Sequence, residues 1–381
     1  MWHARTKPLQ SAGRIQVLGI SQEQHPARTS LFMQWQQMDW PVMVDSLNLL
    51  GVKGIPYTFF LDEQGIIRAV NPKREEALSS FLETDYPAEQ REPVTRWLDR
   101  EDSGAKEVID RVLKPGGTEA VSGHIDFFEK RVARDPKEAR AHFRLGVLYR
   151  MRYDSKYREA GDFEKAVACW QQGLSLHPGQ YIWRRRIQQY GPVLDKPYPF
   201  YDWVETARSE LRERGEVPIP LQARLTGAER VDPKTRPPSG DGDSTRSHPD
   251  PTREVPADVK GLLQVEAFAV KGTGKEDQGY RVHLDLKPNP SLQAHWNNES
   301  GPQTIWLEKL DGWKSSREFV EWDGSVKAAE SSERRFFEFE IEPEGEDPGA
   351  ELTLGGYFFL CEGAGGTCQF VRKEMRVPIL N

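Results

Sequence analysis

Cysteine is scarce in this chain, with only three among 381 residues. So few cysteines exclude a small scaffold in which several disulfides take the place of a hydrophobic core. Cys361 and Cys368 flank a Gly-rich segment of six residues, whereas Cys169 falls alone in a helical pattern. Any disulfide in the chain is therefore expected to be local.

Long apolar runs and a strong charge bias are also missing. No stretch approaches the roughly 18 consecutive apolar residues of a membrane-spanning helix, and the first residues carry no apolar core of a signal peptide. The formal net charge of −7 is modest, and acidic and basic residues are interspersed. A nucleic-acid-binding protein usually has a basic face. The sequence therefore predicts no membrane span and no nucleic-acid partner.

The N-terminal region alternates between strand and helix patterns. The predicted elements, in chain order, are a strand at 14–20, a helix at 27–38, a strand at 41–44, a short helix at 46–50, and a hairpin of strands at 57–61 and 66–70. This order indicates an α/β layer, which we assign to residues 1–115.

Residues 116–225 are polar and helical and contain one internal repeat. Residues 141–149 begin a unit that residues 161–178 complete, with a Leu-Gly…Tyr pattern followed by Gly-Asp-Phe, a small residue and Pro. This unit resembles a tetratricopeptide repeat, with an insertion at 151–159 and half-units on either side. So few repeats predict a small spacer or docking module. The Arg184–Arg186 triplet is expected on a solvated helix face.

The spacing of apolar residues changes in the C-terminal third of the chain. Residues 226–256 are rich in Pro, Gly and charge and nearly free of large apolar side chains, so we expect a flexible linker. After it, apolar and polar residues alternate in several short segments, such as 263–270, 280–286 and 336–341. This pattern predicts a β-sandwich over residues 257–381. The predicted fold class is therefore a multidomain α+β chain.

The segment around Pro56 carries a first family resemblance. Gly54-Ile-Pro56 leads into an apolar strand that a Gly-containing turn brings back as a hairpin. Together with the preceding elements, it resembles the later part of a thioredoxin-like domain of the thiol-reductase or redoxin type. In that family the matching proline is cis and shapes the substrate groove, which implies substrate-binding roles for Ile55 and Pro56. The alternative, from the residues alone, is that Pro56 merely begins a strand.

The family's Cys-x-x-Cys motif is missing. By the resemblance it belongs just upstream of Trp2, after a central strand that the printed sequence also lacks. We therefore expect an N-terminally incomplete domain. Its sheet must close up, recruit a replacement strand or remain unstable.

A second resemblance lies in residues 257–381. Ala294-His-Trp-Asn-Asn, and later Tyr357-Phe-Phe-Leu-Cys361 with Cys368, resemble the N-terminal domain of the DsbD disulfide interchange proteins, an immunoglobulin-like sandwich. The resemblance implies that the cysteine pair relays electrons and that His295 and Trp296 belong to the site. The alternatives are a structural disulfide, two reduced thiols, and a packing role for His295. Glu362 is expected to disfavour the thiolate, and Arg372 is the nearest cation along the chain.

We therefore predict a thiol–disulfide exchange or redox accessory protein with Cys361 and Cys368 as the exchanging pair, and no cofactor or metal. Its expected partners are other thiol–disulfide proteins, and the resemblance implies an extracytoplasmic location. The competing prediction is a non-catalytic protein-binding scaffold with a structural disulfide. Cys169 is expected to be a packing residue.

Overall fold

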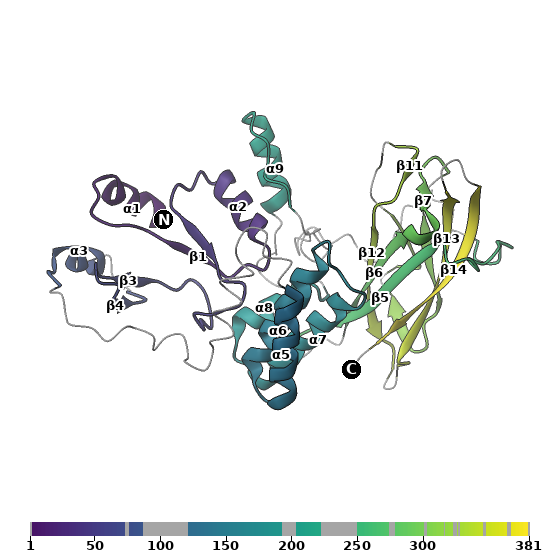
Figure 1. The fold of residues 1–381 in the computed structure, drawn as a ribbon, viewed down its shortest axis with the longest axis horizontal. Coiled ribbons are helices and arrows are strands. Elements are labelled where there is room, and N and C mark those ends of the chain that lie inside the picture. Colours follow the sequence, from purple (N-terminus) through teal and green to yellow (C-terminus); the bar gives the residue numbers. More distant parts are fainter. Residues whose placement is uncertain are drawn as a thin grey trace. The chain divides into compact units, whose positions relative to one another are not determined.

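The structure is a computed structural model. It describes residues 2–72, 76–86, 121–192, 203–221, 250–273, 279–300, 303–315, 317–322, 326, 328–345, 348–363 and 367–379. The chain divides into two compact units, one of residues 1–186 with 203–224 and one of residues 187–202 with 225–381. Helices and antiparallel sheets together make the chain a mixed α+β protein (Figure 1).

The first part of unit 1 contains short strands and three helices. In chain order they are α1 (Trp2–Ser11), β1 (Gly19–Ser21), α2 (Pro26–Trp35), β2 (Val42–Val44), β3 (Phe59–Leu61), β4 (Ile67–Val70) and α3 (Glu76–Glu83). β1 pairs with β2 in parallel, and β3 pairs with β4 in an antiparallel hairpin. Within the described residues the two pairs are separate two-stranded sheets.

Two local predictions in this part differ from the structure. The helix predicted at 46–50 is wrong: these residues form turns. The Asp45 carboxylate accepts the backbone N–H groups of Leu49 and Leu50 at 2.8 and 3.2 Å, and Asn48 has a φ of 49°. A side chain that takes backbone donors in this way competes with helix formation. The strand predicted at 14–20 begins only at Gly19.

The helical part of unit 1 has two closely packed helices at its centre. Its helices are α5 (Val121–Arg134), α6 (Ala139–Tyr153), α7 (Asp162–Leu176), α8 (Tyr181–Gln188, whose last two residues belong to unit 2) and α9 (Trp203–Glu213). α6 and α7 approach closely at Gly146, where a Cβ atom would lie 2.5 Å from Trp170 Nε1. α6 continues through Tyr153, so the start of the predicted insertion at 151–159 is helical.

α9 lies beside α2 although the two are far apart in sequence (Figure 1). The rings of Trp35 and Trp203 stack with centroids 5.9 Å apart, and Trp35 Nε1 donates to Glu210 Oε2 at 2.6 Å. Aromatic stacking and a hydrogen bond therefore hold the C-terminal helix of unit 1 on its α/β part.

Unit 2 contains two antiparallel sheets that share one apolar core. One sheet has the order β5 (Leu263–Lys271), β6 (Tyr280–Pro288), β12 (Arg335–Pro343) and β9 (Trp313–Ser315). The other has the order β10 (Phe319–Glu321), β8 (Thr304–Lys309), β13 (Glu351–Glu362), β7 (Ala294–Asn297) and β11 (Glu330–Ser331), with β14 (Cys368–Pro378) also paired to β13. Leu284, Phe337 and Phe358 are among the buried side chains between them.

The end of the predicted linker packs on unit 2. Residues 226–249 lie outside the described residues, but residues 250–256 follow the edge of β14. The Tyr357 hydroxyl donates to the carbonyl of Asp250 at 2.7 Å, and the Arg372 N–H donates to the carbonyl of Pro256 at 2.8 Å. These residues therefore cover part of the sheet and differ from the flexible segment that their composition predicts.

None of the helices in the described ranges has the length and apolar character that a bilayer-spanning segment requires.

Candidate functional site

Cys361 and Cys368 form a disulfide between β13 and β14. They stand directly opposite each other in the antiparallel register, with their Cα atoms 3.8 Å apart. Cys361 is only 1% exposed, whereas Cys368 is exposed. A reagent that approaches from solvent therefore meets the sulfur of Cys368 first.

His295 lies in the same row of the sheet. It stands directly opposite Cys361 on β7, on the side away from β14. The next residues of the two strands, Trp296 and Leu360, are both fully buried in the core. Because side chains alternate along a strand, His295 and Cys361 lie together on the outer face of the sheet. His295 Nε2 is 3.4 Å from Glu330 Oε2, a residue that the sequence did not single out.

Trp296 does not fit the substrate-binding role assigned to it from the motif. Its ring is 0% exposed, and its Nε1 donates to the carbonyl of Glu333 at 2.8 Å. The guanidinium of Arg335 lies 4.4 Å from the ring centroid. Trp296 therefore stabilises the core of the sandwich, whereas the neighbouring His295 lies on the outer face of the sheet.

The charge beside the disulfide differs from the sequence expectation. Glu362 is paired with Lys260, whose Nζ lies 2.6 Å from the carboxylate. Arg372, the nearest cation along the chain, stands opposite Tyr357 and is paired with Glu308. Lys260 therefore offsets the negative charge of Glu362. Its separation of 102 residues from Glu362 leaves no local signal that could have predicted the pair.

Aromatic rings border the disulfide on the outer face. Phe359 and Phe370 are the directly opposed pair two residues along β13 and β14 from the cysteines, and their rings stack at 4.3 Å. Tyr357 lies 5.2 Å from Phe370, and the guanidinium of Arg253 lies 5.0 Å from the same ring. The exposed sulfur therefore adjoins an aromatic surface, the kind of surface that protein interfaces favour.

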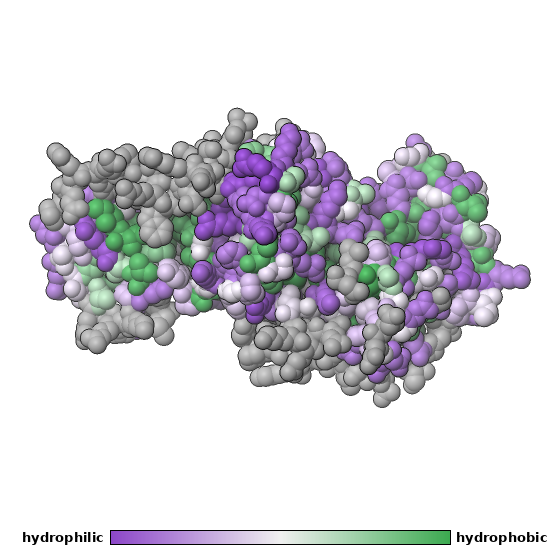
Figure 2. Space-filling view, turned by 90° about the horizontal axis from the view of Figure 1, so that it is seen from below, coloured by the Kyte–Doolittle hydropathy of each residue, from purple (hydrophilic) through white to green (hydrophobic). Residues whose placement is uncertain are grey.

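The Ile55–Pro56 segment belongs to unit 1, whereas the cysteines belong to unit 2. The peptide bond between these residues is cis, and both residues are exposed, Ile55 by 63%. Tyr57 next to them is 44% exposed. Figure 2 shows that hydrophobic residues gather at several places on the face it presents. The two predicted sites thus belong to different units of the chain.

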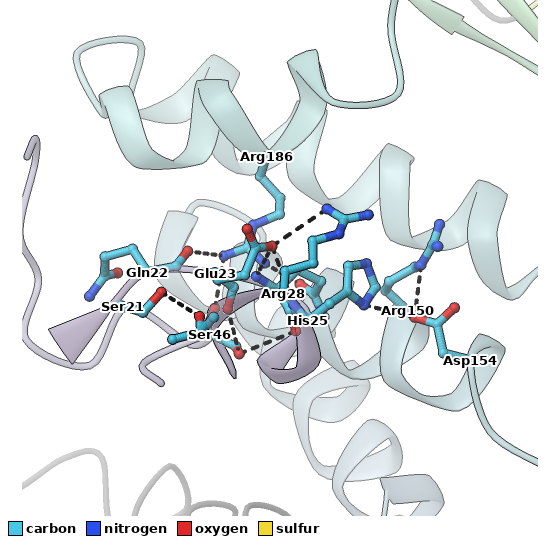
Figure 3. Close-up of polar contacts among 11 residues, drawn as sticks. Ser21, Gln22, Glu23, His25, Arg28, Ser46, Arg150, Asp154 and Arg186 are labelled. Carbon is cyan, nitrogen blue, oxygen red and sulfur yellow. Dashed lines mark hydrogen bonds and ion pairs between the residues drawn. The ribbon is translucent and has the colours of Figure 1, made fainter. Parts of the chain in front are cut away.

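A buried polar cluster joins the α/β part of unit 1 to its helices (Figure 3). Arg186 of α8 is 1% exposed and donates to the Gln24 side chain, to the carbonyl of Gln22 at 3.0 Å and to the carbonyl of Ser46 at 3.4 Å. The prediction that the arginine triplet is solvated is therefore wrong for Arg186. An arginine beside two others gives no sign in the sequence that it is buried.

His25 belongs to the same cluster. Its Nδ1 lies 3.4 Å from Asp154 Oδ2, and Arg28, Arg150 and Arg186 surround it. Burial, together with these three arginines, holds the pKa of His25 well below its usual value of 6.5. His25 is therefore neutral at pH 7. The cluster connects the start of α2, at His25, to the end of α6, at Asp154.

Cys169 carries no reactive thiolate. It is half-buried on α7, and burial raises its pKa to about 12. A thiol with this pKa is protonated at neutral pH and is a poor nucleophile. Among the described residues, no three His, Cys, Asp or Glu side chains are grouped to hold a metal ion.

The disulfide with its exposed Cys368, the outward His295 and the aromatic border is the best candidate site in the described chain. No family model matches the chain, and no curated protein matches it in sequence.

Proposed function

We propose that the chain is a thiol–disulfide exchange protein whose Cys361–Cys368 disulfide exchanges electrons with the dithiols of partner proteins. The unequal exposure of the two cysteines carries this proposal, because it leaves Cys368 open to attack while Cys361 is 1% exposed. The resemblance of residues 257–381 to the DsbD N-terminal domain supports it, since the matching pair in that family relays electrons.

The exchange proceeds in two displacements. A partner thiolate attacks Sγ of Cys368, which forms a mixed disulfide and releases Cys361 as a thiolate that takes up a proton. The partner's second thiolate then attacks the sulfur of the partner's first cysteine in the mixed disulfide. This closes the partner's disulfide and releases Cys368, which also takes up a proton. The partner loses two electrons and two protons, and the cysteine pair gains both.

The surroundings suit a protein partner. The stacked and partly exposed rings of Phe359 and Phe370 offer aromatic contact area near the exposed Cys368. In this proposal the tetratricopeptide-like helices serve as a docking or spacer module, and the thioredoxin-like region around Pro56 retains a substrate-binding surface. An extracytoplasmic location accompanies the proposal, since it follows from the same resemblance.

A second candidate function is protein binding without chemistry. Exposed apolar side chains in the first part of unit 1 favour it, among them Met43 at 57%, Ile55 at 63% and Leu61 at 52%. In that case the disulfide only stabilises the β13–β14 hairpin. A short closed loop of this kind adds little, about 2 kcal/mol or less, because the loop entropy that it removes is small.

A trapping experiment tests the exchange function. The oxidised protein is mixed with a thioredoxin variant that retains only its attacking cysteine, and the products are mapped by peptide mass spectrometry. We expect a mixed disulfide at Cys368 and none at Cys361. A Cys169→Ser protein is the matched control and should form the same adduct. An intact disulfide would favour the scaffold function instead, and an adduct at Cys361 would contradict the attack on Cys368 from which the proposal is argued.

A further inference from the structure

His295, Cys361 and Cys368 occupy one row across three adjacent strands. The register pairs Cys361 with His295 on β7 and with Cys368 on β14. Cβ atoms of directly opposed residues lie about 4.5–5.5 Å apart, which is within reach of an imidazole ring and a sulfur atom. The imidazole is therefore within side-chain reach of Cys361, whose sulfur leaves when Cys368 is attacked.

Both ring nitrogens of His295 face oxygen acceptors. Nδ1 is 3.3 Å from the carbonyl oxygen of Gln293, and Nε2 is 3.4 Å from the carboxylate of Glu330. A neutral imidazole has one N–H donor and one acceptor, so it can satisfy only one of these oxygens. The protonated ring donates to both. Each ring nitrogen therefore has an oxygen acceptor close by when it carries a proton.

Glu330 reaches the ring from a different strand. β11 pairs with β7, and Glu330 stands opposite Asn297, two residues from His295 on the same face. The Glu330 side chain is 62% exposed, whereas the His295 side chain is 14% exposed. Since β7 pairs with both β11 and β13, His295 stands on the strand between those of Glu330 and Cys361.

We propose that His295 is the proton donor and acceptor for Cys361 during exchange, with Glu330 as its positioning residue. This role rests on the exchange chemistry proposed above. When a partner thiolate attacks Cys368, the S–S bond breaks and Cys361 leaves with the electron pair. The imidazolium stabilises this thiolate and gives it a proton, and the neutral ring is reprotonated from solvent. In the reverse direction the neutral ring removes the proton from Cys361.

The test compares the reduction rates of wild-type and His295→Asn proteins by dithiothreitol across pH. The reductant's own thiol titration cancels in the ratio of the two rates. We expect wild type to be about tenfold faster at the acidic end of the range and the ratio to approach one at the alkaline end, because only a protonated histidine can give a proton to the leaving thiolate. A His177→Asn protein, altered at an exposed histidine of unit 1, should match wild type at every pH.

A second variant covers the case in which His295→Asn does not fold. Glu330→Gln changes an exposed side chain, so the fold should tolerate it. Its rate deficit should be smaller than that of His295→Asn and should also grow as the pH falls. A ratio that stays at one, or that is the same at every pH, in the variants that fold overturns the role of His295.

The outcome for His295 is separable from the outcome for the exchange function. If reduced thioredoxin fails to reduce the wild-type disulfide while dithiothreitol succeeds, the exchange function is contradicted, and the dithiothreitol ratios still decide the role of His295. If thioredoxin reduces wild type and His295→Asn equally at all pH values, the exchange function stands and the proton-transfer role is overturned.

Discussion

The ammonium group of Lys260 lies 2.6 Å from the carboxylate of Glu362, the residue that follows Cys361. Lys260 precedes β5, so this ion pair ties the cysteine-bearing end of β13 to the start of the sandwich. It also offsets the negative charge of Glu362, which disfavours the thiolate form of the neighbouring Cys361.

Lys260→Met should slow the oxidation of the reduced cysteine pair by an oxidised partner, at the step in which the Cys361 thiolate attacks Cys368 in the mixed disulfide. The unpaired Glu362 carboxylate disfavours the thiolate of Cys361. Because Lys260 and Glu362 are partly exposed, their pairing is worth only about 0.2–1 kcal/mol, which corresponds to a rate decrease of less than about fivefold. Stopped-flow oxidation at low and high salt measures it. The decrease should vanish at high salt and in a Lys260→Met/Glu362→Gln double variant. An equal decrease at both salt concentrations would exclude this electrostatic cause.

Arg186→Met should destabilise unit 1 by at least about 2 kcal/mol, because it leaves the buried carbonyls of Gln22 and Ser46 without their donor. Arg184→Met is the control from the same triplet: its guanidinium donates at the surface to the carbonyl of Pro178, so the change should cost less than about 0.5 kcal/mol. Urea unfolding followed by helical circular dichroism measures both. Equal effects of the two substitutions would contradict the buried role of Arg186.

The stability of unit 1 should fall as the pH drops below about 6.5, because of His25. Its folded pKa is lowered well below 6.5, so in that range the unfolded chain binds a proton that the folded chain does not. The loss amounts to at most about 1.4 kcal/mol per pH unit for one group. Asp154 acts in the opposite direction, because burial raises its pKa above 3.8.

Comparison with His25→Gln isolates the contribution of His25. Urea unfolding of both proteins between about pH 8 and pH 5.5 should show a steeper loss in wild type than in the variant. Parallel pH dependence of the two proteins would show that His25 is not buried in its neutral form.

Gly146→Ala should destabilise the α6–α7 pair, although alanine normally favours a helix over glycine. The new Cβ would lie 2.5 Å from Trp170 Nε1 and 2.8 Å from the carbonyl oxygen of Ala166. We expect a cost of about 1–3 kcal/mol from this overlap. Gly123→Ala in α5 meets nothing within 4 Å and should stabilise by up to about 1 kcal/mol. Thermal unfolding of the two variants should therefore shift in opposite directions; a rise for Gly146→Ala would contradict the close packing.

The sequence predicted the strands of unit 2 well where apolar and polar residues alternate, as in β5, β6 and β12. One face of each strand is buried, so the alternation of apolar and polar residues follows directly from the burial of that face. The helices α5 to α8 follow their apolar spacing in the same way. The helix predicted at 46–50 failed because a single carboxylate, Asp45, takes the backbone donors that a helix would use.

The site was only partly predictable. The close spacing of Cys361 and Cys368 indicated that any disulfide would be local. The motif that contains His295 and Trp296, by contrast, placed both of these residues in the site. Alternation along β7 sends them to opposite faces, and only His295 shares the face of Cys361. Lys260 and Glu330 reach the site through strand pairing and tertiary packing, which leave no pattern in neighbouring residues. Arg186 is buried for the same nonlocal reason.

The reduction potential of the Cys361–Cys368 disulfide tests the exchange function most directly. It is measured by equilibrating the purified protein in defined thiol–disulfide buffers, trapping the thiols and counting them by mass spectrometry. An exchanging pair should have a potential above about −300 mV and should equilibrate with reduced thioredoxin. A potential below about −300 mV, together with no reaction with thioredoxin, would show that the disulfide is only structural.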